Sequence, residues 1–408
     1  MMQLTVLPNG LRVVSRAMPG VETAAVGLYA EVGSRHEPAR LNGIAHLFEH
    51  MVFKGAGGRS AREISEAIED VGGDLNACTD RDGTNFTASV LAEHVPLAVE
   101  LICDMILSPH FSPADLEREK DVVLQELGEA RDTPNDIIFD ELWAAAFADQ
   151  PLGRAVLGDE ESIEAIALED LQDWRRNRYR SGSLYLVGAG KVDHAQLVTL
   201  AEERLAGLPK GRIDSPEPAR FTGGARVGRA KADQAHLALG FAAPAQRDPD
   251  YYAARFFSDI VGGGMSSRLF QQLREDRGLA YSIYSQLHPY ADAGLFYIYA
   301  ATARRESAAA AQLIEDVLAQ ATETLTEREL ERVRTQARAG LLMSIESPWG
   351  QAHYLARQLS VYGRLVEPAE VIAELQAVTL DEVRAAGRKM LAGPRARATI
   401  GFPAVRAA

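Results

Sequence analysis

The sequence has few cysteines, no long apolar run and fewer basic than acidic residues. Cys78 and Cys103 are its two cysteines among 408 residues, which excludes a disulfide framework and a cysteine-ligated metal site, so both thiols are expected to be packed. No stretch approaches the ~20 apolar residues of a membrane-spanning helix. The net charge of −14 argues against nucleic acid as a partner, because phosphate binding needs a basic surface. The first residues lack the basic and apolar regions of a secretory signal, so a cytoplasmic protein without membrane contact is expected.

Among the residues that are present, one short stretch at 46–50 carries the clearest chemistry. It reads His46-Leu-Phe-Glu49-His50, within an apolar segment bracketed by glycines. On a helix, residues four apart share a face, so the two imidazoles could hold one zinc ion with the glutamate beside them. This order is the inverted form of the H-E-x-x-H zinc motif. The alternative is an ordinary helix with two exposed histidines, and a third ligand would distinguish the two.

A second helix is predicted over residues 113–130. Ser112 and Pro113 supply a cap and a first-turn proline. Glu119 and Glu126 are seven residues apart and share an apolar stripe of this helix. Carboxylates are costly to bury there unless they are paired or bind a cation. The alternative is a stripe that is only partly buried, with solvated acids.

The remaining pattern of the first half alternates antiparallel strands and helices, which predicts an α+β fold. Turn signals predict two hairpins, and further periodic runs predict a long strand and two helices. The expected hairpins pair residues 4–7 with 11–15 and 74–80 with 84–91, the strand covers 23–32, and the helices cover 61–71 and 96–107.

The second half repeats the first at an offset of 212 residues. The helix start at Leu168 has a counterpart at Leu380, and the strand at 23–32 corresponds to 235–242. A Pro- and Gly-rich segment separates the halves, so the expected domains are 1–207 and 227–408 with a linker at 208–226. The offset carries the three polar residues of the 46–50 stretch onto Ser258, Val261 and Gly262, which are not metal ligands. One zinc ion per chain is therefore expected.

These motifs resemble the pitrilysin/insulinase family of zinc metallopeptidases, especially mitochondrial processing peptidase and its bacterial relatives. In that family the third zinc ligand is a glutamate on a later helix, and Glu126, which is 76 residues after His50, occupies the matching place. A further acid seven residues before that ligand lies near the metal, and Glu119 matches it. Gly33-Ser-Arg, the 72–77 segment GGDLNA and the 151–154 segment PLGR are also similar to the family, so the resemblance covers nearly the whole chain.

The resemblance also implies residues that bind substrate. The segment 74–80 matches an edge strand to which the substrate backbone adds, which makes Asn76 and Ala77 candidate contacts. An ordinary internal hairpin strand is the alternative. Arg274 and Tyr281 match an arginine and a tyrosine that bind substrate and help to stabilise the tetrahedral intermediate. Without the family pattern, they would be interpreted as a surface helix charge and a half-buried strand residue.

The resemblance implies two related α+β halves from an internal duplication, each a mainly antiparallel sheet with helices packed on one side. It implies a zinc-dependent endopeptidase that cleaves unfolded peptides or flexible protein segments in a closed chamber. His46, His50 and Glu126 would bind Zn²⁺, and Glu49 would be the general base toward a zinc-activated water. Because this chain carries both signatures at about half the length of single-chain relatives, a homodimer is expected. The alternatives are a non-catalytic peptide-binding or scaffold homologue and a small-molecule zinc hydrolase.

Overall fold

A computed structural model describes residues 1–402, which form two compact units. The first unit contains residues 1–127, 155–217 and 341–366, and the second contains 128–154, 218–340 and the described residues from Glu367 onward. The units meet in sequence at Glu217 and Pro218, inside the segment predicted as a linker, and each also takes a segment from the other half of the chain. The domain bounds 1–207 and 227–408 stay a prediction, and residues 403–408 lie outside the described part.

The first unit is built on a six-stranded sheet in the order β1-β2-β8-β3-β7-β6. Its neighbours pair antiparallel except β2 and β8, which are parallel. The predicted hairpins at 4–7 with 11–15 and 74–80 with 84–91 are confirmed as β1–β2 and β6–β7. The strands and main helices are β1 (Met2–Val6), β2 (Arg12–Ala17), β3 (Thr23–Ala30), α1 (Ile44–Val52), α2 (Ala61–Glu69), β6 (Asp74–Thr79), β7 (Thr84–Leu91), α3 (Val95–Leu107), α4 (Pro113–Asp132, its residues to Leu127 belonging here), α6 (Glu160–Ala165), α7 (Leu168–Arg178), β8 (Leu184–Gly190), α8 (His194–Arg204) and α12 (Pro348–Tyr362).

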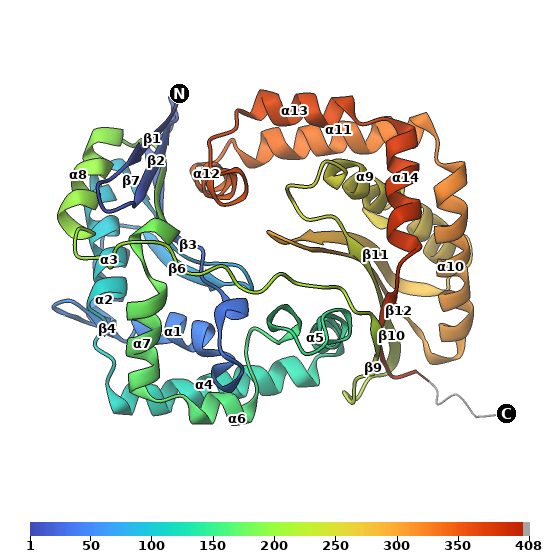
Figure 1. Ribbon diagram of the computed structural model, residues 1–408, viewed down its shortest axis with the longest axis horizontal. Helices are drawn as coiled ribbons and strands as arrows, with labels where there is room; N and C mark the ends of the chain where they lie inside the picture. Colours follow the sequence, from blue (N-terminus) through green and yellow to red (C-terminus); the bar gives the residue numbers. More distant parts are fainter. Residues whose placement is uncertain (403–408) are drawn as a thin grey trace. The chain divides into compact units, whose positions relative to one another are not determined.

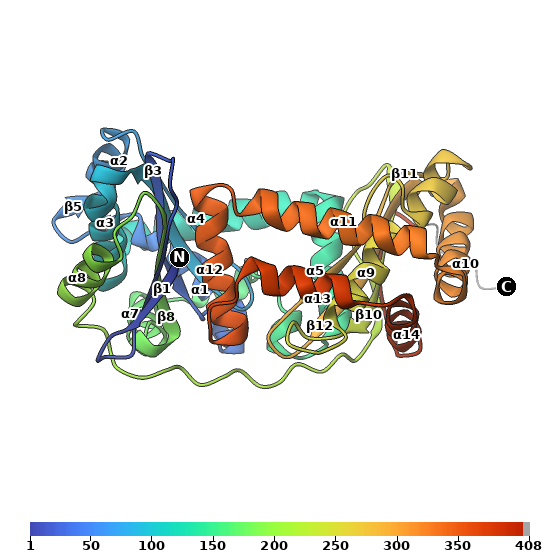
Figure 2. The same cartoon turned by 90° about the horizontal axis from the view of Figure 1, so that it is seen from above.

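Both faces of this sheet are covered, because the side chains of its central strand are buried on either side. In β3, Val26 and Leu28 point into the larger core, which includes residues of α1, α3 and α8. Ala25 and Tyr29 of the same strand point to the opposite face, where Leu355 and Leu359 of α12 pack. Figures 1 and 2 show α3 and α8 on one side of the sheet and α12 on the other.

The second unit repeats this plan, with a five-stranded sheet in the order β11-β12-β10-β13-β9. At the 212-residue offset, the counterparts of these five strands are β6, β7, β3, β8 and β2, in that order. Read from β6 to β2, this is the strand order of the first sheet, and the parallel pair β13–β9 corresponds to the parallel pair β8–β2. The duplication predicted from the 212-residue offset agrees with this topology. The elements are α5 (Pro134–Ala146), β9 (Gly224–Val227), β10 (Gln234–Ala243), α9 (Tyr251–Gly262), β11 (Ala280–Pro289), β12 (Gly294–Ala303), α10 (Ser307–Thr324), α11 (Glu327–Ser344, its residues to Gly340 belonging here), α13 (Pro368–Ala377), α14 (Leu380–Leu391) and β13 (Arg395–Ile400).

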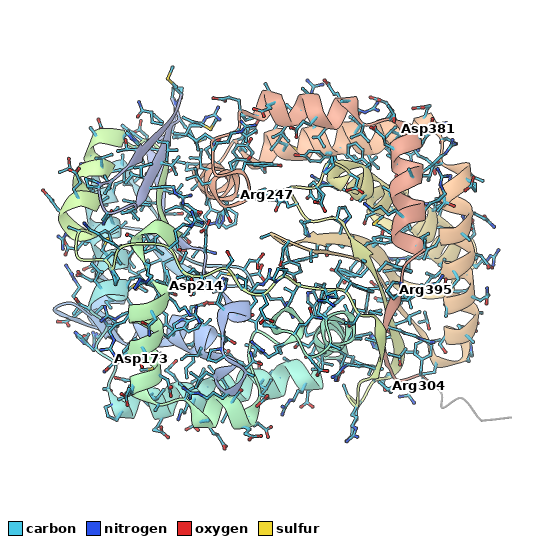
Figure 3. All side chains as sticks on the ribbon, viewed as in Figure 1. Asp173, Asp214, Arg247, Arg304, Asp381 and Arg395 are labelled. Atoms are coloured by element: carbon cyan, nitrogen blue, oxygen red, sulfur yellow. The ribbon has the colours of Figure 1, made fainter. Side chains whose placement is uncertain are left out.

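Helices also lie on both faces of the second sheet. On one face Phe296 of β12 packs edge-on against Phe257 of α9, with ring centroids 5.9 Å apart. On the other, Leu142 and Trp143 of α5 pack in one cluster with Ala238 of β10 and with alternate residues of β12 and β13. At the start of β13, Arg395, labelled in Figure 3, reaches Glu315 of α10 at 2.5 Å.

The α+β class and the two halves are confirmed, and one detail of the prediction needs correction. Helices were expected on one side of each sheet, whereas α12 and α5 cover the second faces. The physical reason is that the central strands are apolar on both faces, and such a sheet needs a second covering layer. Within residues 1–402, no helix has both the length and the apolar content required to cross a bilayer.

Candidate metal centre

Helix α1 begins in a tight, buried turn. Gly43 precedes it with φ 94°, a left-handed conformation that favours glycine, and a Cβ there would lie 2.5 Å from Cδ1 of Ile163. The buried carboxylate of Glu37 accepts hydrogen bonds from the backbone N–H groups of Gly43 at 2.9 Å and Ala45 at 2.8 Å. A negative charge at this end complements the helix dipole and satisfies free N–H groups. The start of the helix is therefore fixed.

The two predicted histidines of α1 meet the predicted glutamate of α4. Nε2 of His46 lies 3.8 Å from Oε2 of Glu126, and Nε2 of His50 lies 3.7 Å from the same oxygen. One ligand atom from each residue falls within 4.8 Å of the other two, and this is the one such group found within residues 1–402. The periodicity of α1 brings the imidazoles together, and the pairing of α1 with α4 brings the carboxylate.

This geometry fits a zinc ion. Ligand atoms at about 2.0–2.2 Å from a tetrahedral zinc are roughly 3.3 Å apart, a few tenths of an ångström closer than the separations from Glu126. Burial, reinforced by the nearby His50, lowers the pKa of His46 to about 4, so this imidazole is in the neutral form that binds metals. Nδ1 of His50 lies 3.2 Å from Oε2 of Glu119, so Nδ1–H donates in the tautomer that leaves Nε2 free for a metal.

Glu119 is held from its other side by Lys54. The ammonium Nζ of Lys54 lies 2.8 Å from Oε1 of Glu119, whose side chain is 7% exposed. The remaining carboxylates, Glu49 and Glu126, lie near the same histidines. The negative charge of the three glutamates therefore exceeds the single positive charge of Lys54. This excess of negative charge suits a divalent cation.

The carboxylate of Glu49 is oriented by a strand residue. The hydroxyl of Thr79, at the end of β6, donates to Oε2 of Glu49 at 2.5 Å. Burial raises the pKa of Glu49, and the hydrogen bonds from Thr79 oppose part of that rise. A carboxylate whose pKa moves toward neutrality is better matched to accepting and returning a proton.

The candidate substrate strand lies at an edge of the first sheet. β6 pairs with β7, and no further strand in residues 1–402 pairs with its other side. Asn76 is exposed, while the side chain of Ala77 packs against the core. Cys78 is exposed and Cys103 is buried, so the prediction of two packed thiols is wrong for Cys78. The reason is strand alternation, which places Cys78 on the exposed face with Asn76.

Arg274 and Tyr281 belong to the second unit, and both are exposed. The guanidinium of Arg274 lies over the ring of Phe270, 4.9 Å from its centroid, in a π-helical turn at Phe270–Glu275. Tyr281 lies at the start of β11 with 74% of its surface exposed. Their role toward substrate stays a prediction.

Two residues of the site were missed from the sequence, Thr79 and Lys54. Both act through contacts between elements, Thr79 with α1 and Lys54 with α4. Strand alternation places Thr79 on the same face of β6 as Ala77, which would have predicted its direction but not its partner.

Comparison with known proteins agrees with the resemblance in the sequence. Residues 12–160 match a family model described as insulinase (peptidase family M16), and residues 165–337 match one described as the peptidase M16 inactive domain. A Mycobacterium leprae protein named an uncharacterized zinc protease is 37% identical over 394 residues, covering 95% of this chain and 88% of the relative. The uncharacterized zinc protease YmxG of Bacillus subtilis is 33% identical, covering 96% of each chain.

Solved structures support the fold. A peptidase M16 inactive domain from Pseudomonas fluorescens superposes with a TM-score of 0.92 at 23% identity, covering 100% of this chain and 99% of that one. A protease from Helicobacter pylori gives the same TM-score at 22% identity, covering 98% of this chain and 99% of that one. The family matches and the curated relatives, taken with the His-His-Glu group, place this chain in the insulinase family of peptidases, peptidase family M16.

Proposed function

We propose that the protein is a zinc-dependent endopeptidase that cleaves unfolded peptides or flexible protein segments. The observation that carries this proposal is the convergence of His46, His50 and Glu126 within 4.8 Å, with Glu49 on the same helix as the two histidines. Three protein ligands leave a position open for water, as in catalytic zinc sites. The match to the inactive-domain model falls on residues 165–337, where no comparable ligand group occurs among the described residues.

A zinc ion held by these three residues would polarise the scissile carbonyl and lower the pKa of the attacking water. Glu49 takes a proton from that water as the water oxygen bonds to the carbonyl carbon. Glu49 then delivers the proton to the amide nitrogen as the C–N bond breaks, giving a carboxylate and an amine. Glu119 holds the ring of His50 in the required tautomer, and Lys54 holds Glu119.

The free edge of β6 is a suitable place for the substrate. An extended peptide can pair with the N–H and C=O groups of that edge, and main-chain pairing tolerates many side-chain sequences. Asn76 and Ala77 would lie beside such a peptide. An unfolded or flexible segment can adopt this extended form without first breaking other structure, which favours unfolded or flexible substrates.

The test is cleavage of an unfolded-peptide mixture by the purified protein, with zinc content measured on the same sample. Chelator should abolish cleavage. Glu49→Gln should keep its zinc and lose activity by about 10²-fold or more, because it removes the general base. Glu69→Gln, at an exposed position of α2, is the matched control. A Glu49→Gln variant with the wild-type rate would contradict the proposal, and zinc binding without cleavage of any peptide would favour a non-catalytic peptide-binding role.

We also propose that two chains form a homodimer enclosing the reaction chamber. The support is the division of residues within one chain, since the ligands belong to the first unit while Arg274 and Tyr281 are exposed on the second. Light scattering on the purified protein should give twice the chain mass of 44.3 kDa. A fully active monomer would contradict this arrangement.

A further inference from the structure

Within residues 1–402, one side-chain hydrogen bond reaches the carboxylate of Glu49, and it comes from Thr79, whose backbone also acts on the same carboxylate. The torsion that turns a glutamate carboxylate about its last bond is broad, so the helix alone does not fix the plane of this group. The 2.5 Å bond from the Thr79 hydroxyl to Oε2 does fix it. A hydrogen bond to an ionised acceptor is among the stronger hydrogen bonds in proteins.

The hydroxyl of Thr79 has a second neighbour, but that neighbour competes poorly. Oγ1 of Thr84 lies 3.4 Å away, and the Thr84 hydroxyl itself donates to the carbonyl of Val32 at 2.8 Å. The proton of Thr84 is thus engaged elsewhere. Glu49 is the nearer and the charged acceptor, so the single proton of Thr79 goes to Glu49.

Thr79 is also held in place by the hairpin that it ends. Its Cα partner on β7 is Thr84, and the next residue, Asp80, donates from N–H to the carbonyl of Gly83 at 2.8 Å. The carbonyl of Asp80 accepts from the N–H of Ser34 at 3.1 Å. Gly33, just before Ser34, has no space for a side chain, since a Cβ would lie 2.2 Å from the Asp80 carbonyl oxygen.

An ion pair completes this anchor. The buried guanidinium of Arg35 lies 2.9 Å from Asp82 in the hairpin loop, and the N–H of Arg35 donates to the carbonyl of Arg81 at 3.1 Å. The Gly33-Ser34-Arg35 segment therefore clamps the loop that follows Thr79. The backbone position of Thr79 is set by this frame rather than by contact with Glu49.

We propose that Thr79 is a positioning residue for Glu49. By donating to Oε2, it orients the carboxylate so that Oε1 is the oxygen that accepts the proton of the attacking water. The inference rests on the proposed role of Glu49 as general base. Because Thr79 ends β6, the strand that would pair with substrate also holds the base, and the distance between base and scissile carbonyl is fixed through one element.

The consequence is a change in turnover without a change in binding. The hydroxyl of Thr79 faces Glu49, whereas substrate would pair with the backbone edge of β6. Thr79→Val keeps the size and strand preference of the side chain and removes the donor. Its kcat should fall by about 10- to 100-fold, the scale of a misplaced catalytic group, while KM stays within about twofold.

The experiment measures kcat and KM on a fluorogenic peptide for the wild type, Thr79→Val, Thr79→Ser and Thr23→Val. Serine keeps the hydroxyl and should recover most of the turnover. Thr23→Val is the control, because Thr23 is an exposed residue whose partner on β7, Leu91, is at the opposite end of that strand from Thr84. Zinc affinity by chelator competition and the melting temperature are recorded for each variant and should match the wild type.

Three outcomes would overturn the inference alone. The first is a Thr79→Val variant with wild-type kcat, and the second is a Thr79→Ser variant that loses as much turnover as the valine variant. A fall in kcat accompanied by lost zinc would also overturn it, since the residue would then support the metal site rather than the base. A wild type without chelator-sensitive cleavage would overturn the proposed function itself and the role of Thr79 with it.

Discussion

Replacing Glu37 with alanine should loosen the start of α1 and weaken metal binding. The side chain is 4% exposed, and its two oxygens accept from the N–H groups of Gly43 and Ala45 and from the side-chain amide of Asn42, all at 2.8–2.9 Å. A buried donor that loses its partner costs about 1–3 kcal/mol. Water entering the vacated space recovers part of this cost, so we expect a loss of about 3–5 kcal/mol for the three donors. Glu37→Gln keeps one acceptor oxygen and should cost about 2 kcal/mol.

Urea unfolding and zinc affinity together test this reasoning. The denaturation midpoint should fall in the order wild type, glutamine variant, alanine variant. Zinc affinity should fall in the same order, because His46 follows Ala45 directly and depends on the first turn of the helix. Glu69→Ala, on the exposed face of α2, serves as the control. A Glu37→Ala variant within about 0.5 kcal/mol of the wild type, the range of ordinary surface changes, would refute the assigned role.

Three further predictions concern ionisable groups of the first unit. Lys54→Met should cost about 1–3 kcal/mol in urea unfolding by leaving the buried charge of Glu119 without its neighbouring ammonium, and adding Glu119→Gln should recover much of that loss. Glu119→Gln alone should weaken zinc binding by about 10- to 100-fold in a chelator competition at constant pH, and an unchanged affinity would contradict its role. Burial lowers the pKa of His36 in the folded protein to about 4 from 6.5, so protonation of this ring favours the unfolded chain. The free energy of unfolding, complete above pH 6.5, should therefore decrease by about 3 kcal/mol as the pH falls toward 4, and the decrease should be smaller in His36→Gln.

The candidate metal ligands could be predicted to different degrees from the sequence. The pairing of His46 with His50 follows from helix periodicity, which depends only on neighbouring residues. Glu126 could be placed on an apolar stripe, but its approach to the histidines came from the family resemblance. Thr79 and Lys54 escaped prediction because their partners are set by packing between elements.

The features of the fold that could not be predicted from the sequence also depend on packing between distant elements. The hairpins and the duplication left local or repeated signals in the sequence. The positions of α5 and α12 did not, because each packs on a sheet whose strands lie far away in the chain. The exposure of Cys78 depends on which face of β6 turns outward, which composition does not determine.

The position of α12 has a consequence for how the chain is made. Synthesis proceeds from the amino terminus, so every strand of the first sheet has been made once residue 190 is added. Helix α12, at Pro348–Tyr362, is made much later. Until then, the apolar face around Val14, Tyr29 and Val187 has no covering helix. During this interval, that face of the nascent first half is exposed to water or bound by a chaperone. A shortened chain that ends at the junction between the halves would keep it open permanently.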